Sequence, residues 1–203
     1  MRGSASFALA GLAVALAFPT VLVAAPTRSS SSASAAAPTA HTAGRTCTPR
    51  KKAACQQVDL SGRKLTRRDL TEANFHQADL HKASLWASNT WRANFRGADL
   101  SKANLTSGNR TRADFRAADM RGADLYNADF WGANMRGADM RGVKLSRTRL
   151  DRADLTDATL QGAKTDSYTI AGAVLCRTTM PNGKVAKPSC GQRTDGGSGV
   201  GTD

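Results

Sequence analysis

Large apolar side chains recur at every fifth position along the middle of this chain. From Leu60 to Met180 nearly every fifth residue is Leu, Phe, Met or Ile, and the residue two places before it is usually Ala. Five steps rotate a side chain about 140° beyond a full turn of an α-helix and reverse its side on a strand, so neither element keeps these side chains on one face. A chain that turns once per repeat keeps them all inside, which predicts a solenoid.

A second period in the same stretch gives the length of one coil. Phe75, Phe95 and Phe115 stand 20 residues apart. The same spacing separates Thr90 from Arg110, the two mid-domain central positions without an apolar side chain. Columns at this spacing indicate four repeats per coil and a squared cross-section. We therefore expect an all-β solenoid of about six coils, stacked at the roughly 4.8 Å spacing of β-structure.

The other positions of the repeat fit the same interpretation. Ala two places before the central residue indicates a second inward site with little room. Asp or Asn usually stands directly before the central residue, as at Asp79, Asp99 and Asp119, and its short side chain can accept hydrogen bonds from nearby backbone N–H groups. Gly often stands two places after the central residue, as at Gly97 and Gly122, which predicts tight backbone there.

The resulting motif, Ala-(Asp/Asn)-(Leu/Phe/Met)-X-X, resembles the repeat of the pentapeptide repeat family, and the resemblance covers residues 56–180. It implies that family's fold, a right-handed quadrilateral β-helix. Some members of the family resemble duplex DNA in shape and charge and protect topoisomerases. Those members are intracellular and acidic, whereas this chain has a net charge of +13 and begins with an apolar leader. We therefore do not expect that role here.

Changes in composition divide the chain into a leader, a linker, a capped solenoid and a tail. Arg2 precedes a largely apolar core that ends in Ala24-Ala25, as in secretory signal peptides. An uncleaved membrane anchor is the alternative, and no other segment is apolar enough to span a bilayer. The predicted segments are a signal peptide at 1–25, a disordered Ser/Ala/Pro linker at 26–46, an N-terminal cap at 47–58, the pentapeptide-repeat solenoid at 59–180, a C-terminal cap at 181–190 and a disordered tail at 191–203.

Export would allow the four cysteines to form disulfides. Three connectivities are possible, and we favour Cys47–Cys55 and Cys176–Cys190 because each bond is local and lies at an open end of the solenoid. The bare edge of a terminal coil is the weak point of a solenoid, so disulfide-closed ends would restrict fraying. Zinc ligation by cysteine and histidine is the alternative, but the sequence has no CxxC pair. We predict no metal and no cofactor.

Thr90 and Arg110 form an irregularity within the predicted core. Because a buried, unpaired guanidinium costs several kcal/mol, we expect Arg110 to turn outward or the backbone to bulge, with Asn89, Asn109 and Gly108 assisting. The irregularity is either a tolerated defect or a kink or notch that serves a ligand. Replacement of Arg110 by Leu separates the two interpretations.

Four aromatic residues form a candidate surface on the outside of the solenoid. Trp86 and Tyr126 share one column, and Trp91 and Trp131 share the column on the next face. The members of each pair are two coils apart, or about 10 Å. Aromatic platforms of this kind suit sugar rings, nucleobases or a protein contact. Alternatively, the rings cover gaps on the rod or contact the tails.

A second candidate surface is basic. Arginines one coil apart stand about 5 Å from one another and repel, which makes a flat anionic polymer a plausible counterpart. Asp columns run alongside, so local pairing of Arg with Asp is the alternative. The residues concerned are Arg92, Arg96, Arg112, Arg116, Arg136, Arg121 and Arg141.

Catalysis has little support in the sequence, which contains three histidines and no HExxH, GxSxG or phosphate-cradling motif. We predict a non-enzymatic, exported binding or structural module, secreted or attached to a bacterial cell envelope. Its partner would be an unknown protein or an anionic envelope polymer. A purely structural spacer and a binder of nucleic acid are the alternatives. The sequence gives neither the partner's identity nor the oligomeric state.

Overall fold

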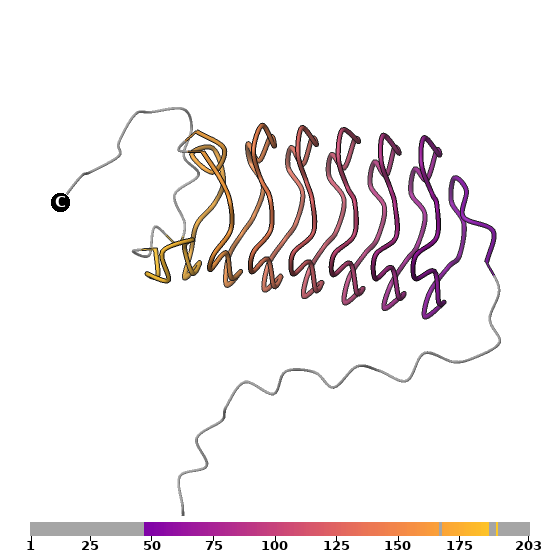
Figure 1. Ribbon diagram of the computed structural model, residues 1–203, viewed down its shortest axis with the longest axis horizontal. Coiled ribbons are helices and arrows are strands. Elements are labelled where there is room, and N and C mark those ends of the chain that lie inside the picture. Colours follow the sequence, from indigo (N-terminus) through magenta and orange to yellow (C-terminus); the bar gives the residue numbers. More distant parts are fainter. Residues whose placement is uncertain (1–46, 167, 187–189, 191–203) are drawn as a thin grey trace, which may run out of the picture. The chain divides into compact units, whose positions relative to one another are not determined.

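The computed structural model describes residues 47–166, 168–186 and 190, so the predicted signal peptide at 1–25, linker at 26–46 and tail at 191–203 lie outside the described residues. Within them the chain winds into stacked coils (Figure 1), with no helix and no strand longer than one residue. Single residues form parallel bridges to residues 20 positions further on, as Asp79 does with Asp99 and Asp99 with Asp119. These bridges confirm the coil length that the sequence predicts.

Both predicted inward positions of the repeat are buried. The large central side chains form one continuous core, in which the ring of Phe95 stacks between those of Phe75 and Phe115, with centroids 5.0 and 4.8 Å away. The small residues two places before the centre, such as Ala78 and Ala98, pack against this core and are at most 1% exposed. The prediction of a second, tighter inward site is confirmed.

The Asp or Asn before each central residue holds the turn and links neighbouring coils. The Oδ1 atom of Asp99 accepts a 2.8 Å hydrogen bond from the backbone N–H of Ser101, which is the predicted side-chain turn. The backbone of Asp99 donates to the carbonyl of Ala78 (3.0 Å) and accepts from the N–H of Leu80 (2.7 Å). One residue type therefore fixes the turn and carries the ladder between coils.

The residue two places after the centre adopts a positive φ, so the predicted tight backbone is confirmed. One column contains Gly97 and Gly137, each with φ of 64°, and Ala117 with φ of 53°. Because this region costs a residue with a Cβ roughly 1–2 kcal/mol, glycine suits the position. Many repeats nevertheless carry a larger residue there, so the stacking of coils imposes the conformation on it.

The structure contains the disulfides Cys47–Cys55 and Cys176–Cys190, in the pairing that we favoured. The first bond joins Cys47 to Cys55, whose N–H already donates to the carbonyl of Asn74 on the next coil, and the second joins the last coils to the segment that follows them. In the described part of the chain no cysteine is free.

The regular ladder ends near the C-terminus. Thr179 pairs with Val185 in an antiparallel bridge, and the N–H of Ala186 donates to the carbonyl of Thr178 at 2.8 Å. The turn that reverses the chain is the Pro-Asn-Gly sequence at 181–183. No helix among the described residues is long and apolar enough to cross a membrane.

Candidate ligand-binding face

Arg110 lies inside the core and Asn109 keeps its regular bridges to Asn89 and Asp129, so the prediction that Arg110 turns outward or that the backbone bulges is wrong. Its side chain is 0% exposed, and its Nη2 donates a 2.7 Å hydrogen bond to the carbonyl of Leu85. Nη1 lies 3.4 Å from the carbonyl oxygen of Ser88. The room comes from Gly108, which stands where most repeats carry Ala: a Cβ there would lie 1.3 Å from Nη1 of Arg110. A missing methyl group accommodates the guanidinium.

The charge of Arg110 has no carboxylate partner among the described residues, and its Nε has no hydrogen-bond partner there. Burial lowers the pKa of Arg110 to about 9, which leaves the side chain charged at neutral pH. Thr90, the other polar central residue, is also fully buried, but its hydroxyl donates to the carbonyl of Asn109 at 3.2 Å. Of these two polar residues, the arginine is therefore the one with a buried polar atom that lacks a hydrogen-bond partner.

We call the side of the solenoid whose central residues are Leu70, Thr90, Arg110, Phe130 and Leu150 the Arg110 face. The exposed residues of this face stand directly before the central ones and include Asn109. A two-residue turn borders the face on each side. These turns position the side chains that follow.

The four candidate aromatic residues stand on the two borders of the Arg110 face. Trp86 and Tyr126 lie on the turn that precedes the face, and Trp91 and Trp131 on the turn that follows it. Trp86 and Tyr126 are 37% and 41% exposed. Trp91 and Trp131 are only partly exposed, so the second pair is more buried than the sequence suggested.

A guanidinium lies over each of the four rings. Distances from Cζ to the ring centroid are 4.6 Å for Arg67 on Trp86, 5.7 Å for Arg147 on Tyr126, 4.3 Å for Arg92 on Trp91, and 5.3 and 5.5 Å for Arg112 and Arg152 on Trp131.

The sequence pattern predicts only part of this set of arginines. Arg92 and Arg112 fall on the predicted basic surface, whereas Arg67, Arg147 and Arg152 are missing from that prediction. Each of these three arginines is separated from its ring by one residue more or one residue fewer than the 20 residues of a full coil. That offset makes residues neighbours on adjacent coils, and it is the signal that would have found them.

Four of the five remaining candidate arginines pair with aspartates. The ion pairs are Arg116–Asp114 (2.6 Å), Arg121–Asp119 (2.5 Å), Arg136–Asp154 (3.2 Å) and Arg141–Asp139 (2.6 Å). Partial burial by itself raises the pKa of Asp139, but hydrogen bonds and charge from Arg141 outweigh it and hold that pKa below its ordinary value. Arg96 forms no ion pair with a described residue. For the four paired arginines, local pairing is the interpretation that the geometry favours.

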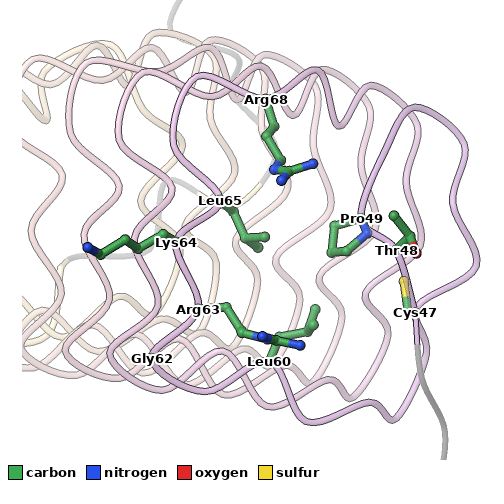
Figure 2. A pocket seen from close by; sticks show the side chains of 9 residues that line it. All are labelled: Cys47, Thr48, Pro49, Leu60, Gly62, Arg63, Lys64, Leu65 and Arg68. Atoms are coloured by element: carbon green, nitrogen blue, oxygen red, sulfur yellow. The ribbon is translucent and has the colours of Figure 1, made fainter.

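A hollow of about 540 Å³ lies at the N-terminal end of the solenoid. Figure 2 shows Arg68 above and Arg63 below Leu65, with Pro49 from the preceding segment across from them. Its lining includes no carboxylate. The hollow therefore marks a loosely packed, basic end of the solenoid.

The two histidines within the repeats are engaged in hydrogen bonds. Nδ1 of His76 lies 2.9 Å from the carbonyl oxygen of Arg96, and Nδ1 of His81 lies 2.7 Å from Oγ of Ser101. No group of His, Cys, Asp or Glu in the described ranges is arranged to hold a metal ion.

A model of the family described as "Pentapeptide repeats" matches residues 53–89, 78–122, 92–132 and 133–164, with 8 copies. The chain belongs to the pentapeptide-repeat family. Members fold as right-handed quadrilateral β-helices, and the bridges described above place this chain in that architecture. Pentapeptide-repeat proteins are generally non-enzymatic structural or binding proteins.

Several solved structures of pentapeptide-repeat proteins are similar to this chain. HetL, involved in heterocyst differentiation regulation in the cyanobacterium Nostoc sp. strain PCC 7120, is 23% identical, with 67% of this chain and 82% of HetL covered and a TM-score of 0.38. A protein from the Arabidopsis thaliana thylakoid lumen is 22% identical, with 62% and 63% covered and a TM-score of 0.31, so the chain spans less than two thirds of that protein.

One solved structure of QnrB1, a plasmid-mediated fluoroquinolone resistance protein, is also similar to this chain, with 13% sequence identity. The similarity covers 63% of this chain and 79% of QnrB1, with a TM-score of 0.31. A comparison with curated proteins gave no match.

Proposed function

We propose that this chain is a non-enzymatic, exported binding module that contacts the cell envelope or an extracellular partner through the outer faces of its solenoid. One observation carries the proposal: the arginines are not equivalent. Arg116, Arg121 and Arg141 are neutralised by aspartates of their own repeats. The arginines beside the aromatic rings have no such partners among the described residues, so positive charge and aromatic surface coincide on one face.

Export is supported by two independent features. The leader at 1–25 has the composition of a secretory signal peptide. The two disulfides are bonds that persist in oxidising compartments and are rare in the cytosol. The same bonds would close the ends of the solenoid, which agrees with a protein that works outside the protection of the cytoplasm.

The experiment that tests this function has two parts. Fractionation of the producing cell should recover the protein outside the cytoplasm with its leader removed. The purified protein should then be retained on an isolated envelope preparation, and salt should release it because exposed charges are screened. Cytoplasmic protein with an intact leader would contradict export.

Two variants separate a binding module from a structural spacer. Exchange of Arg112 and Arg152 for Gln should reduce retention on envelope material. Exchange of the aspartate-paired Arg116 and Arg141 for Gln removes the same charge and should reduce it less. A spacer would show no retention in the unaltered protein, or an equal loss in both variants.

A further inference from the structure

We propose that the Arg110 face binds a carboxylated polysaccharide, with sugar rings resting on the bordering aromatics and sugar carboxylates meeting the stacked arginines. This inference deepens the proposed function, on which it rests, by naming the class of ligand. Three properties of the face carry it: the spacing of the rings, the position of the guanidinium groups over them and the distribution of charge.

The rings border a strip of polar residues, which stand directly before the central residues of the face. Trp86 and Tyr126 occupy the same column two coils apart, or about 10 Å, and the coil between them carries Thr106 at that position. On the opposite border the residue between Trp91 and Trp131 is Thr111. Small hydroxyl side chains thus alternate with large rings on both borders. A polymer of rings joined by polar links fits such an alternation, because rings stack and hydroxyls exchange hydrogen bonds.

The two borders differ in which coils supply the arginines that lie over their rings. Arg67 reaches Trp86 from the coil on its N-terminal side, and Arg147 reaches Tyr126 from the coil on its C-terminal side. No described cation stacks on either ring from the coil between them. The two exposed rings thus stand one coil to either side of Thr106, where a ligand would contact both of them.

The arginines that lie over the rings offer hydrogen-bond donors whose positions are restricted. A guanidinium held over an aromatic face by a cation–π contact is restricted in its position, and its N–H groups remain available as donors. Arg112 and Arg152 lie over the ring of Trp131, and Arg92 lies over that of Trp91. The planar fork of an arginine matches a carboxylate with two parallel hydrogen bonds, and stacking reduces the freedom that binding would otherwise remove.

The carboxylates on or beside this face do not pair with the arginines over the rings. Asp129 and Asp151 lie within ion-pair distance of Arg149, Glu72 lies near Lys52, and Asp69 accepts hydrogen bonds from Thr71. None of the ring-stacked arginines forms an ion pair with a described residue. Arg110 adds a buried cation without a carboxylate under the same face. An anionic ligand would supply the missing charge.

The compartment favours a polysaccharide over a nucleic acid. Single-stranded nucleic acid also binds to surfaces that combine aromatic rings with arginine. The two disulfides, however, are typical of the oxidising space outside the cytoplasm, where cell-surface polysaccharides are accessible to a protein. The hydroxyl and amide groups of Thr106, Asn109 and Thr111 are also matched to sugar hydroxyls.

The test uses the full chain, with its disulfides oxidised, and three probes: polygalacturonate as the carboxylated polymer, dextran as the neutral polymer and oligo(dT) as the nucleic acid. Affinities are measured by calorimetry at two salt concentrations. The face variants are Trp86→Ala with Tyr126→Ala, and Arg112→Gln with Arg152→Gln. The matched control is Arg116→Gln with Arg141→Gln, which removes the same charge from arginines that pair with aspartates. Thermal unfolding of each variant verifies that it is folded.

We expect polygalacturonate to bind, dextran to bind far more weakly, and each face variant to weaken polygalacturonate binding by about tenfold or more while the control changes it by about threefold at most. The proposal is overturned if dextran binds as well as polygalacturonate, or if the control loses as much affinity as the face variants. It is also overturned if oligo(dT) binds at least as tightly as polygalacturonate and loses affinity in the same face variants, since the face would then read nucleic acid.

The outcome separates this inference from the proposed function. If envelope material retains the protein through Arg112 and Arg152 but polygalacturonate does not bind, the ligand class is wrong and the binding function stands. If neither envelope material nor any polymer retains the protein, both are wrong.

Discussion

Gly108 and Arg110 share one place in the core: a Cβ on the glycine would lie 1.3 Å from Nη1 of the arginine. The pair replaces the usual Ala and apolar residue of the repeat with a small and a long side chain. The guanidinium fits into the volume that the methyl group vacates and hydrogen-bonds to the carbonyl of Leu85. Two departures from the repeat thus compensate each other in shape, although they leave the charge without a counter-ion.

Restoring both consensus residues should therefore stabilise the protein. Gly108→Ala alone overpacks the core and should lower the free energy of unfolding by about 1–3 kcal/mol. Gly108→Ala combined with Arg110→Leu removes the buried charge and the clash with the guanidinium. The new Cβ would still lie 2.6 Å from the carbonyl oxygen of Ser88, so the coil must shift to the spacing of the Ala repeats, and the free energy of unfolding should then rise by about 1–4 kcal/mol above the unaltered protein. Urea denaturation measures both. A double variant that is less stable than Gly108→Ala alone would show that the two residues do not compensate each other.

Truncation of a stacked phenylalanine should be costly. The ring of Phe95 is fully buried between Phe75 and Phe115, so Phe95→Ala should lower the free energy of unfolding by about 3–5 kcal/mol. Phe95→Leu keeps most of the volume and should cost less. The measurement is chemical denaturation of both variants. Equal effects of Ala and Leu would mean that the volume of the ring is not what stabilises the column.

Gly137 and Ala117 occupy the same column with φ of 64° and 53°, so exchanging their types should change stability in opposite directions. Gly137→Ala places a Cβ in the left-handed region and should cost about 1 kcal/mol, although the space around it is open. Ala117→Gly removes that strain and should gain up to about 1 kcal/mol, offset in part by the larger entropy of the unfolded chain. Thermal unfolding of the two single variants is the check, and changes of the same sign would refute it.

The aspartates of the turns should make the protein sensitive to acid. Burial by itself raises the pKa of Asp114 and Asp139, but hydrogen bonds and charge from Arg116 and Arg141 hold both pKa values below 3.8. The unfolded chain then binds protons more readily than the folded one. The stability that these two carboxylates contribute is present at pH values above 3.8, the ordinary pKa of an aspartate. It is lost as the pH falls through the lower pKa values of the folded protein.

Asparagine provides the matched control for this pH dependence. Asn94 already holds a turn of the same kind, since its Oδ1 accepts a 3.0 Å hydrogen bond from the N–H of Arg96. Asp114→Asn with Asp139→Asn should therefore keep the turns and lose less stability than the unaltered protein between about pH 5 and pH 2.5. Denaturation midpoints across that range measure the difference. Parallel curves would mean that these two carboxylates do not contribute to the acid sensitivity.

Removal of the disulfides should destabilise the ends of the solenoid before its middle. Cys176→Ser with Cys190→Ser should lower the free energy of unfolding by about 2–4 kcal/mol, since the bond restricts the unfolded chain and the terminal coil. Hydrogen exchange should then rise first in the last coils, while amides near Phe115 stay protected. Uniform loss of protection along the solenoid would contradict a role at its end.

The sequence by itself determined the coil, because one physical requirement repeats at every fifth residue. Each central side chain must be buried, so the period of five and the columns at 20 suffice to predict the turns, the two inward positions and the parallel stacking. The turn chemistry follows equally locally, since Asp99 bonds to a backbone group only two residues away.

Only the tertiary structure decided where the charged side chains go. A long side chain can reach across neighbouring coils, so its column does not fix its partner: Arg116 meets an aspartate of its own repeat, whereas Arg147 lies over a tyrosine of another coil. The sequence-based prediction for Arg110 was wrong for the same reason. Its inward position depends on a methyl group that Gly108 lacks, and that space exists only once the coils are packed against each other.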